Sequence, residues 1–279
     1  MKKAVKGGGT AGLVGQLRDN LAVLAEKASQ KDLSGHVRKS LDLEMRKFIG
    51  EIEVLLGGLN PIRQPLAVFD PSDPKLVGRF VALALVSQER TPLAGIEPFY
   101  GSGVYAIYYK GPFKLYAPIS GTETPIYVGQ AAPAQANARR PTDQGSKLSA
   151  RLNEHLKNIL KAKESLEIGD FECRALVVQS GWETAAEDYL IHLFHPIWNS
   201  ETKILYGLGK HGDKATTRTN KRSPWDTIHP ARKWAAETTE DAKTPAQIAE
   251  ELERHFEKTQ IYRTMDDVLH DFVRELRQS

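Results

Sequence analysis

Two tyrosines stand in short segments rich in β-forming residues, where a phenol could take part in proton transfer. Tyr105 ends the tripeptide GVY that opens the segment 103–109, and Tyr127 opens the tripeptide YVG. Arg151 and His155 are four positions apart in a later helical pattern, so both side chains lie on one face of a helix. A guanidinium binds phosphate through parallel hydrogen bonds, and an imidazole exchanges a proton near neutral pH. These side chains suit acid–base chemistry on an anionic substrate.

Two polar residues further along the chain complete this set of candidates. Glu187 lies in a helical pattern over 183–194, and Asn199 follows that pattern. His192 and His195 have a spacing that metals can use, but they have no further cysteine or histidine partners, so ordinary helix residues are the simpler interpretation. The sequence contains no P-loop, no dinucleotide-binding glycine motif and no HExxH motif.

Hydrophobic periodicity predicts the elements that position these side chains. Strands are predicted over 104–109, 126–128 and 171–178. Helices are predicted over 75–89, 146–163 and 183–194, with two more in the tail. The first of these helices has Ser72 or Asp73 as its cap. Arg151 and His155 then lie on one helix between the second and third strands, which gives an α+β fold.

The chain divides into three parts by pattern. In the first 60 residues, apolar side chains recur at three- and four-residue steps, which predicts a helical hairpin that ends at the glycine pair 57–58. From this we predict a helical arm over 1–64, a core over 65–235 and an acidic helical tail over 236–279. With 279 residues, of which 41% are hydrophobic, the chain can form one large domain or two modest ones.

The order of these motifs resembles the GIY-YIG nuclease family. The family is named for two short tyrosine motifs on adjacent strands, which read GVY and YVG here. The resemblance continues with an arginine on a helix, a histidine one turn later, a metal-binding glutamate and an asparagine, which correspond to Arg151, His155, Glu187 and Asn199. It implies a small three-stranded antiparallel sheet flanked by helices, to which the arm and the tail are added.

Two features are similar to the type II restriction endonuclease branch of that family. The two tyrosine motifs are further apart than in many members, so an insertion over 110–125 lengthens the hairpin. Residues 207–230 contain GLGKHG, RSPWD and HP, which are similar to the C-terminal region of restriction enzymes that cut a GC-rich palindrome of the CCGCGG kind. The resemblance covers about residues 65–235 and implies cleavage of DNA at a six-base site of that kind.

The resemblance also implies roles in water activation. Tyr105 would act as a general base once its phenol pKa, ordinarily about 10, is lowered by the Arg151 cation and a metal. His155 would accept the phenol proton, and Tyr127 would orient water or phosphate through its hydroxyl. Whether Tyr105 or His155 takes the proton of the attacking water stays open at this point.

Arg151, Glu187 and Asn199 would act on the phosphate and the metal. The resemblance implies that Arg151 makes a forked contact to the phosphate oxygens. Glu187 would hold a single Mg²⁺, for which Mn²⁺ can substitute, and Asn199 would hydrogen-bond to Glu187 or to the phosphate.

The charge distribution favours a nucleic-acid partner more than the net charge does. The formal net charge is +3, but residues 131–163 and 203–233 are strongly basic, whereas residues 237–279 are acidic. Basic surfaces bind phosphates, and contacts to base edges provide sequence specificity. Candidate DNA-binding residues are Arg139, Arg140, Lys147, Lys210, His211, Arg218, Lys221 and Arg222.

These observations predict a Mg²⁺-dependent type II restriction endonuclease that acts on double-stranded DNA. A palindromic site implies a two-fold symmetric homodimer with one active site per strand, a tetramer on two sites being an alternative. The arm and the tail are interpreted as dimerisation or wrapping elements, and a cognate DNA methyltransferase is expected as the genetic partner. Two other hypotheses are a homing or repair-type GIY-YIG nuclease and a DNA-binding protein without catalysis; the complete set of site residues argues against the latter.

Composition indicates where such a protein works. The single cysteine, Cys173, excludes an intrachain disulfide, and no apolar run approaches the length of a membrane span. Glycines near the N-terminus replace the apolar run of a signal peptide. We therefore expect a cytoplasmic protein with no membrane partner, and the resemblance to restriction enzymes implies that its host is a prokaryote.

Overall fold

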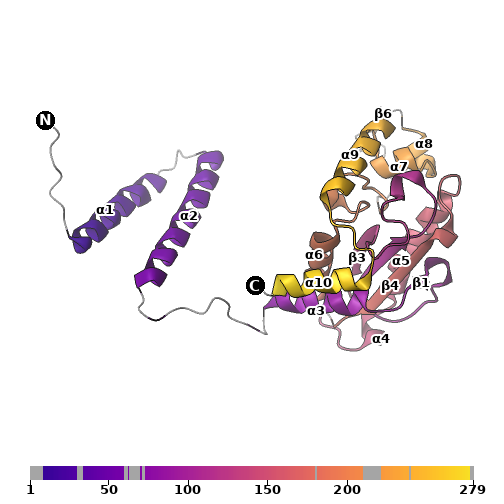
Figure 1. The fold of residues 1–279 in the computed structure, drawn as a ribbon, viewed down its shortest axis with the longest axis horizontal. Coiled ribbons are helices and arrows are strands. Elements are labelled where there is room, and N and C mark those ends of the chain that lie inside the picture. The colour runs from indigo at the N-terminus through magenta and orange to yellow at the C-terminus, as the bar shows by residue number, and fades with distance from the viewer. Residues whose placement is uncertain are drawn as a thin grey trace. The chain divides into compact units, whose positions relative to one another are not determined.

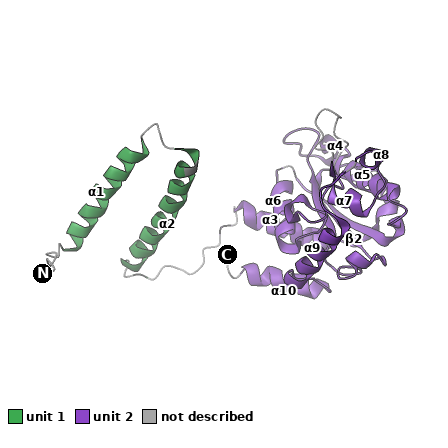
Figure 2. Cartoon of the chain, turned by 90° about the horizontal axis from the view of Figure 1, so that it is seen from above, with its two compact units in different colours: residues 1–66 green, residues 67–279 purple. Residues whose placement is uncertain are grey.

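The computed structural model describes residues 9–29, 34–59, 62, 70, 73–179, 181–209, 221–238 and 240–276. The chain forms two compact units, one over Met1–Leu66 and one over Ala67–Ser279 (Figure 2). The tail helices therefore belong to the same unit as the sheet. All six residues expected to be catalytic lie in this second unit.

The described part of the first unit contains two helices, α1 (Thr10–Ala28) and α2 (Gly35–Leu59) (Figure 1). Their bounds match the helical periodicity of the first 60 residues. Large apolar side chains on both helices are exposed, among them Leu17 on α1 and Phe48 and Leu56 on α2. The helical pattern of this arm is thus confirmed, while its apolar faces are not buried within the described residues.

A four-stranded antiparallel sheet forms the centre of the second unit, in the order β1-β4-β2-β3. Its strands are β1 (Thr91–Pro92), β2 (Gly103–Tyr109), β3 (Tyr127–Ala131) and β4 (Phe171–Val177). The three predicted strands are confirmed as β2, β3 and β4. The expected antiparallel core of three strands is therefore present, and β1 adds a fourth strand by pairing with β4 at the edge of the sheet. Two residues, one of them proline, carry no alternating pattern that a sequence could reveal.

β2 is the central strand of the site, and all seven of its residues are buried. Tyr105 lies opposite Gly129 on β3 and Ala175 on β4. A Cβ atom on Gly129 would stand 2.5 Å from Tyr105 Oη, so only glycine leaves room for the phenol there. Alternate residues of β2 enter two cores, one containing Tyr105 and the other Tyr108.

The helices cover the two faces of this sheet. α5 (Lys147–Lys161) buries Leu148 and Leu152 in the core of Tyr105. α3 (Pro74–Val86) and α6 (Glu183–Phe194) pack in the core of Tyr108 on the opposite face. Asp73 caps α3 by accepting a hydrogen bond from the Lys75 amide at 2.9 Å, which agrees with one of the two predicted caps.

The remaining elements complete the second unit. The further helices of the described residues are α4 (Pro141–Gln144), α7 (Pro224–Ile228), α8 (Lys233–Ala236), α9 (Pro245–Lys258) and α10 (Met265–Leu276). A small parallel pair consists of β5 (Lys221–Arg222) and β6 (Glu240–Asp241). α9 buries Ile248 and Leu252 in the core of Tyr105, so the acidic tail is part of the packing around the site. Within the described residues, no helix is long and apolar enough to span a membrane.

Candidate active site

A tyrosine–histidine pair forms the centre of the site. Tyr105 Oη lies 2.7 Å from His155 Nε2, and both side chains are buried. Tyr105 comes from the middle of the central strand, and His155 comes from the face of α5 that packs on this strand. The predicted proximity of these two residues is therefore present in the fold, at the distance of a short hydrogen bond.

Tyr127 and Arg151 complete the polar side of this pair. The Tyr127 ring lies 4.7 Å from the His155 ring and 6.0 Å from the Tyr105 ring, measured between centroids. Arg151 is near enough to both phenols to oppose the rise of their pKa values on burial, and one third of its side chain is exposed. Arg151 Nη1 also donates to Glu154 at 2.5 Å. The guanidinium thus joins the buried tyrosines to the surface, where an anion can reach it.

The protonation states at neutral pH follow from burial. Burial raises the pKa of Tyr105 well above its ordinary value, Tyr127 adds to this rise, and Arg151 opposes it. Arg151 lowers the Tyr105 pKa, as expected, but the cost of burying a phenolate is larger than the effect of this one cation. Burial, together with Arg151, lowers the pKa of His155 to about 3. Tyr105 is therefore a phenol and His155 a neutral imidazole.

Glu187 lies on α6, near Tyr127. Its carboxylate is close enough to Tyr127 to raise the pKa of that phenol, although burial is the larger cause. Burial raises the pKa of Glu187 itself, and the neighbouring Gln130 on β3 opposes this rise. Sequence reasoning missed Gln130; the signal was its position two residues after the buried Val128 on the same strand.

Asn199 holds the strand that carries Tyr127. Its side-chain oxygen accepts a hydrogen bond from the Val128 amide at 3.0 Å, and its nitrogen donates to the Val128 carbonyl at 2.9 Å. Asn199 is buried, and these contacts differ from the expected hydrogen bond to Glu187. The amide therefore fixes the backbone of β3 directly between Tyr127 and Gly129.

The donor set at Glu187 suits a hydrated hard cation. Among the residues that the structure describes, no group of three or more histidine, cysteine, aspartate or glutamate side chains could hold a metal ion. His192 and His195 form a ring pair with centroids 5.9 Å apart, without a third such ligand in the described part. Mg²⁺ commonly keeps several waters and takes one or two carboxylates together with substrate phosphates. Glu187 fits that pattern, and it does not fit a closed all-protein cage.

The predicted DNA-binding residues fall into three groups. Arg139, Arg140 and Lys147 are exposed around α4 and the start of α5, and Arg140 forms an ion pair with Asp143 at 2.8 Å. Lys221 and Arg222 lie on β5 and pair with Glu240 and Asp241 on β6 at 3.4 and 2.6 Å. Lys210, His211 and Arg218 lie outside the described residues.

The insertion and the HP motif are joined in one buried network. Tyr116, from the insertion over 110–125, contacts His229 Nε2 at 2.5 Å through its hydroxyl. His229 Nδ1 lies 2.8 Å from the Ser165 hydroxyl, and the Trp198 indole donates to Tyr116 at 3.0 Å. Burial lowers the pKa of His229 to about 3. His229 therefore has a packing role in this network.

The comparison with known families agrees with this geometry. The family model described as the Eco29kI GIY-YIG domain matches residues 97–256, which is more than half of the chain. The matched range contains the strands β2, β3 and β4 and all six residues expected to be catalytic. No curated protein matches the chain. On the strength of the matched family model, the chain belongs to the GIY-YIG restriction endonuclease family and is a nuclease that binds DNA.

Proposed function

We propose that this nuclease is a type II restriction endonuclease that hydrolyses both strands of double-stranded DNA at a palindromic, GC-rich site of the CCGCGG kind. The observation that carries the proposal is the buried hydrogen bond of 2.7 Å between Tyr105 and His155, with Arg151 beside it. A phenol, a neutral imidazole and a partly exposed guanidinium are the groups needed to activate water and to bind a phosphate.

The attacking water gives its proton to Tyr105 as the Tyr105 proton moves to His155. A free phenolate is not available beforehand, because burial raises the Tyr105 pKa. The neutral His155 has a lone pair that can receive this proton. Because burial also disfavours the imidazolium, the proton stays on His155 only while the phosphate reacts. Tyr105 thus accepts the proton of the attacking water, and His155 accepts the proton that Tyr105 gives up.

Arg151 and Tyr127 bind the phosphate in this proposal. Arg151 exchanges its hydrogen bond with the exposed Glu154 for a forked contact to the phosphate oxygens. Tyr127, which is nearly buried and lies against His155, orients the phosphate or the water through its hydroxyl. Asn199 keeps Tyr127 in place through the Val128 backbone and acts as a positioning residue.

Glu187 would hold the metal ion, with the Gln130 side chain as its neighbour. A Mg²⁺ ion, or Mn²⁺ in its place, supplies charge stabilisation at the phosphate and at the leaving 3′ oxygen when bound. Glu187 is half-buried near Tyr127, so waters and phosphate can provide the remaining ligands of the metal ion.

The assembly follows from the symmetry of the DNA. Two identical active sites are needed to cut both strands of a palindrome, which requires a homodimer or a tetramer that binds two sites. The exposed apolar side chains of α1 and α2 support a role of the arm in that assembly. Such an enzyme works in the cytoplasm of a prokaryote, where a cognate methyltransferase protects the host DNA.

The direct test is digestion of a long DNA of known sequence by the purified protein with Mg²⁺. Discrete fragments whose ends share one palindrome are expected, and the same bands should appear with Mn²⁺. Random nicking would reject site-specific cleavage and favour a repair-type nuclease. Tight binding without cleavage in either metal would favour a DNA-binding protein without catalysis.

A further inference from the structure

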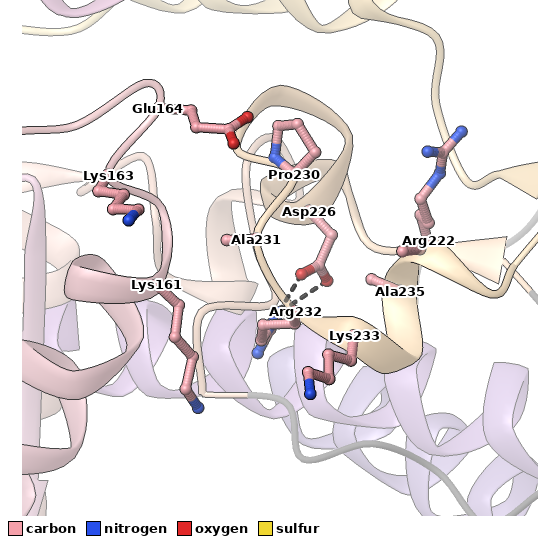
Figure 3. Close-up of a pocket in the computed structure, with 11 residues that line it drawn as sticks. Lys161, Lys163, Glu164, Arg222, Asp226, Pro230, Ala231, Arg232, Lys233 and Ala235 are labelled. Atoms are coloured by element: carbon pink, nitrogen blue, oxygen red, sulfur yellow. Dashed lines mark hydrogen bonds and ion pairs between the residues drawn. The ribbon is translucent and has the colours of Figure 1, made fainter.

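A basic pocket of about 400 Å³, shown in Figure 3, has neither Tyr105 nor His155 in its lining. Lys161 at the end of α5 and Lys163 just after it line one side, and Lys233 at the start of α8 lines another. We call this site the lysine pocket, after these three residues. It joins the ends of the two basic segments of the sequence, 131–163 and 203–233, which are separate along the chain.

The three lysines provide charge that the surrounding residues do not neutralise. Of the other cations in the lining, Arg232 pairs with Asp226 and Arg222 pairs with Asp241, each at 2.6 Å. Among the residues that the structure describes, Lys161, Lys163 and Lys233 form no ion pair with a carboxylate, and all three are exposed. Glu164 is the remaining acidic residue of the lining. The pocket therefore attracts an anion.

Arg232 gives the lysine pocket a fixed wall. Two of its nitrogens donate to the Asp226 carboxylate, each at 2.6 Å, and this pair is almost fully buried. The guanidinium also donates to the carbonyls of Gly207 at 2.7 Å and Leu208 at 3.2 Å. Figure 3 shows Lys161 and Lys233 on either side of Arg232. Because Arg232 is held in place, the flexible lysine side chains can move onto a ligand while the backbone around the pocket stays fixed.

The backbone of residues 207–209 links the lysine pocket to the active site. The Leu208 carbonyl, which accepts from Arg232, also accepts from Asn158 of α5 at 3.1 Å. The next residue, Gly209, would place a Cβ atom 3.4 Å from Arg151 Nη2. Arg151 and Lys161 lie on one helix, and a helix rises about 1.5 Å per residue, so they are separated by roughly 15 Å. Each strand of duplex DNA carries one phosphate per about 3.4 Å of helix axis, so a separation of that size reaches a backbone phosphate a few nucleotides from the one at Arg151.

We propose that Lys161, Lys163 and Lys233 bind a backbone phosphate of the DNA a few nucleotides from the scissile one. The inference rests on the proposed function, because it takes Arg151 as the ligand of the scissile phosphate. Ammonium groups on flexible stems bind phosphate as point charges and read no base. The lysine pocket thus adds affinity and fixes the position of the duplex, and it adds no sequence specificity.

The test uses the full-length protein with Lys161, Lys163 and Lys233 all changed to glutamine. A matched control changes Lys75, Lys114 and Lys258, which are exposed on other elements, so both variants lose the same charge. Binding to a duplex that contains the site is measured without Mg²⁺ over a range of salt concentrations, together with the cleavage rate at saturating DNA. Thermal unfolding checks that both variants are folded, which exposed positions favour.

The pocket variant should bind roughly tenfold more weakly than the control, with a salt slope smaller by about 0.9 for each lost phosphate contact. Its cleavage rate at saturating DNA should equal that of the wild type. Equal affinity and equal slope in the two variants would overturn the proposal. It would also be overturned if inorganic phosphate raised the melting temperature of the wild type, and not of the pocket variant, while the DNA slope was unchanged.

The two failures are distinguishable. If the wild type bound DNA with the pocket-dependent slope but cut nothing, the nuclease assignment of Tyr105 and Glu187 would fail and the lysine pocket would stand. If the wild type cut DNA into discrete fragments and the pocket variant matched the control, the reverse conclusion would follow.

Discussion

At the residue scale, the site depends on how burial sets protonation. Tyr105 and His155 share one hydrogen bond in a buried position, where burial raises the pKa of the phenol and lowers that of the imidazole to about 3. Both groups are consequently neutral at pH 7, and neither holds a charge until a substrate reacts. The pair is thus suited to passing a proton in a single concerted step.

Replacing Tyr105 by phenylalanine should remove the proton acceptor next to the water. The ring is kept, so the core is preserved, while loss of acid–base catalysis typically lowers a rate by roughly 10²–10⁴-fold. Single-turnover cleavage with saturating protein measures this rate, and DNA affinity serves as the control because it should stay within about twofold. A Tyr105→Phe variant that cut at the wild-type rate would exclude Tyr105 as the base.

Changing Glu187 to glutamine should abolish cleavage and spare DNA binding. The glutamine side chain has nearly the size of the glutamate and stays near Gln130, but it lacks the negative charge that binds a divalent cation. Cleavage is followed over a Mg²⁺ titration, with Asp188→Asn as the matched control, since Asp188 is the exposed neighbour on α6. Normal cleavage by Glu187→Gln at low Mg²⁺ would remove Glu187 from the metal site.

At the element scale, strand register and close approach bring the residues together. β2 carries Tyr105 between β3 and β4, and Gly129 on β3 faces it. α5 places His155 against the Tyr105 hydroxyl, while Asn199 hydrogen-bonds to the backbone of Val128. Because each of these contacts joins a different element, a shift of any one element moves the tyrosine away from the histidine.

Gly129→Ala should separate Tyr105 from His155. The new methyl group would lie 2.5 Å from Tyr105 Oη, so the phenol has to move, at a cost in stability of about 1–3 kcal/mol. Cleavage should fall more than DNA binding, and thermal unfolding reports the loss of stability. Gly95→Ala is the matched control, because a Cβ atom there meets nothing within 4 Å. Equal activity in both variants would show that the register around Gly129 is not needed.

At the scale of the whole molecule, the two basic segments meet in the second unit, and the acidic tail packs into the same unit. α9 of the tail contributes Ile248 and Leu252 to the core around Tyr105, although the tail carries a net negative charge. The basic segments and the acidic tail are thus separate parts of one folded unit. The net charge of +3 conceals this separation.

The two buried histidines should make the second unit sensitive to acid. The pKa values of His155 and His229 fall from 6.5 to about 3 on burial, so below pH 6.5 the unfolded chain binds protons that the folded chain does not. The free energy of unfolding should therefore fall as the pH goes from 6.5 toward 3, by up to about 1.4 kcal/mol per pH unit for each histidine. Urea unfolding at several pH values measures this slope.

His229→Gln is the control for that slope. The glutamine can replace part of the hydrogen bonding to Tyr116 and Ser165 but does not titrate. The variant should be less stable at pH 7.5 and should lose stability less steeply as the pH falls. An unchanged slope would mean that His229 does not contribute to the acid sensitivity.

The sequence alone determined the strands β2, β3 and β4, the helices α5 and α6, and the order of the six site residues. These follow from local propensity and periodicity, which act over a few neighbouring residues. Only the tertiary structure decided the partners: Gln130 beside Glu187, Val128 as the partner of Asn199, and the raised pKa of Tyr105. Burial and contacts between distant segments set these properties, and no local pattern encodes them. The lysine pocket has the same origin, since it exists only where the end of α5 meets α8.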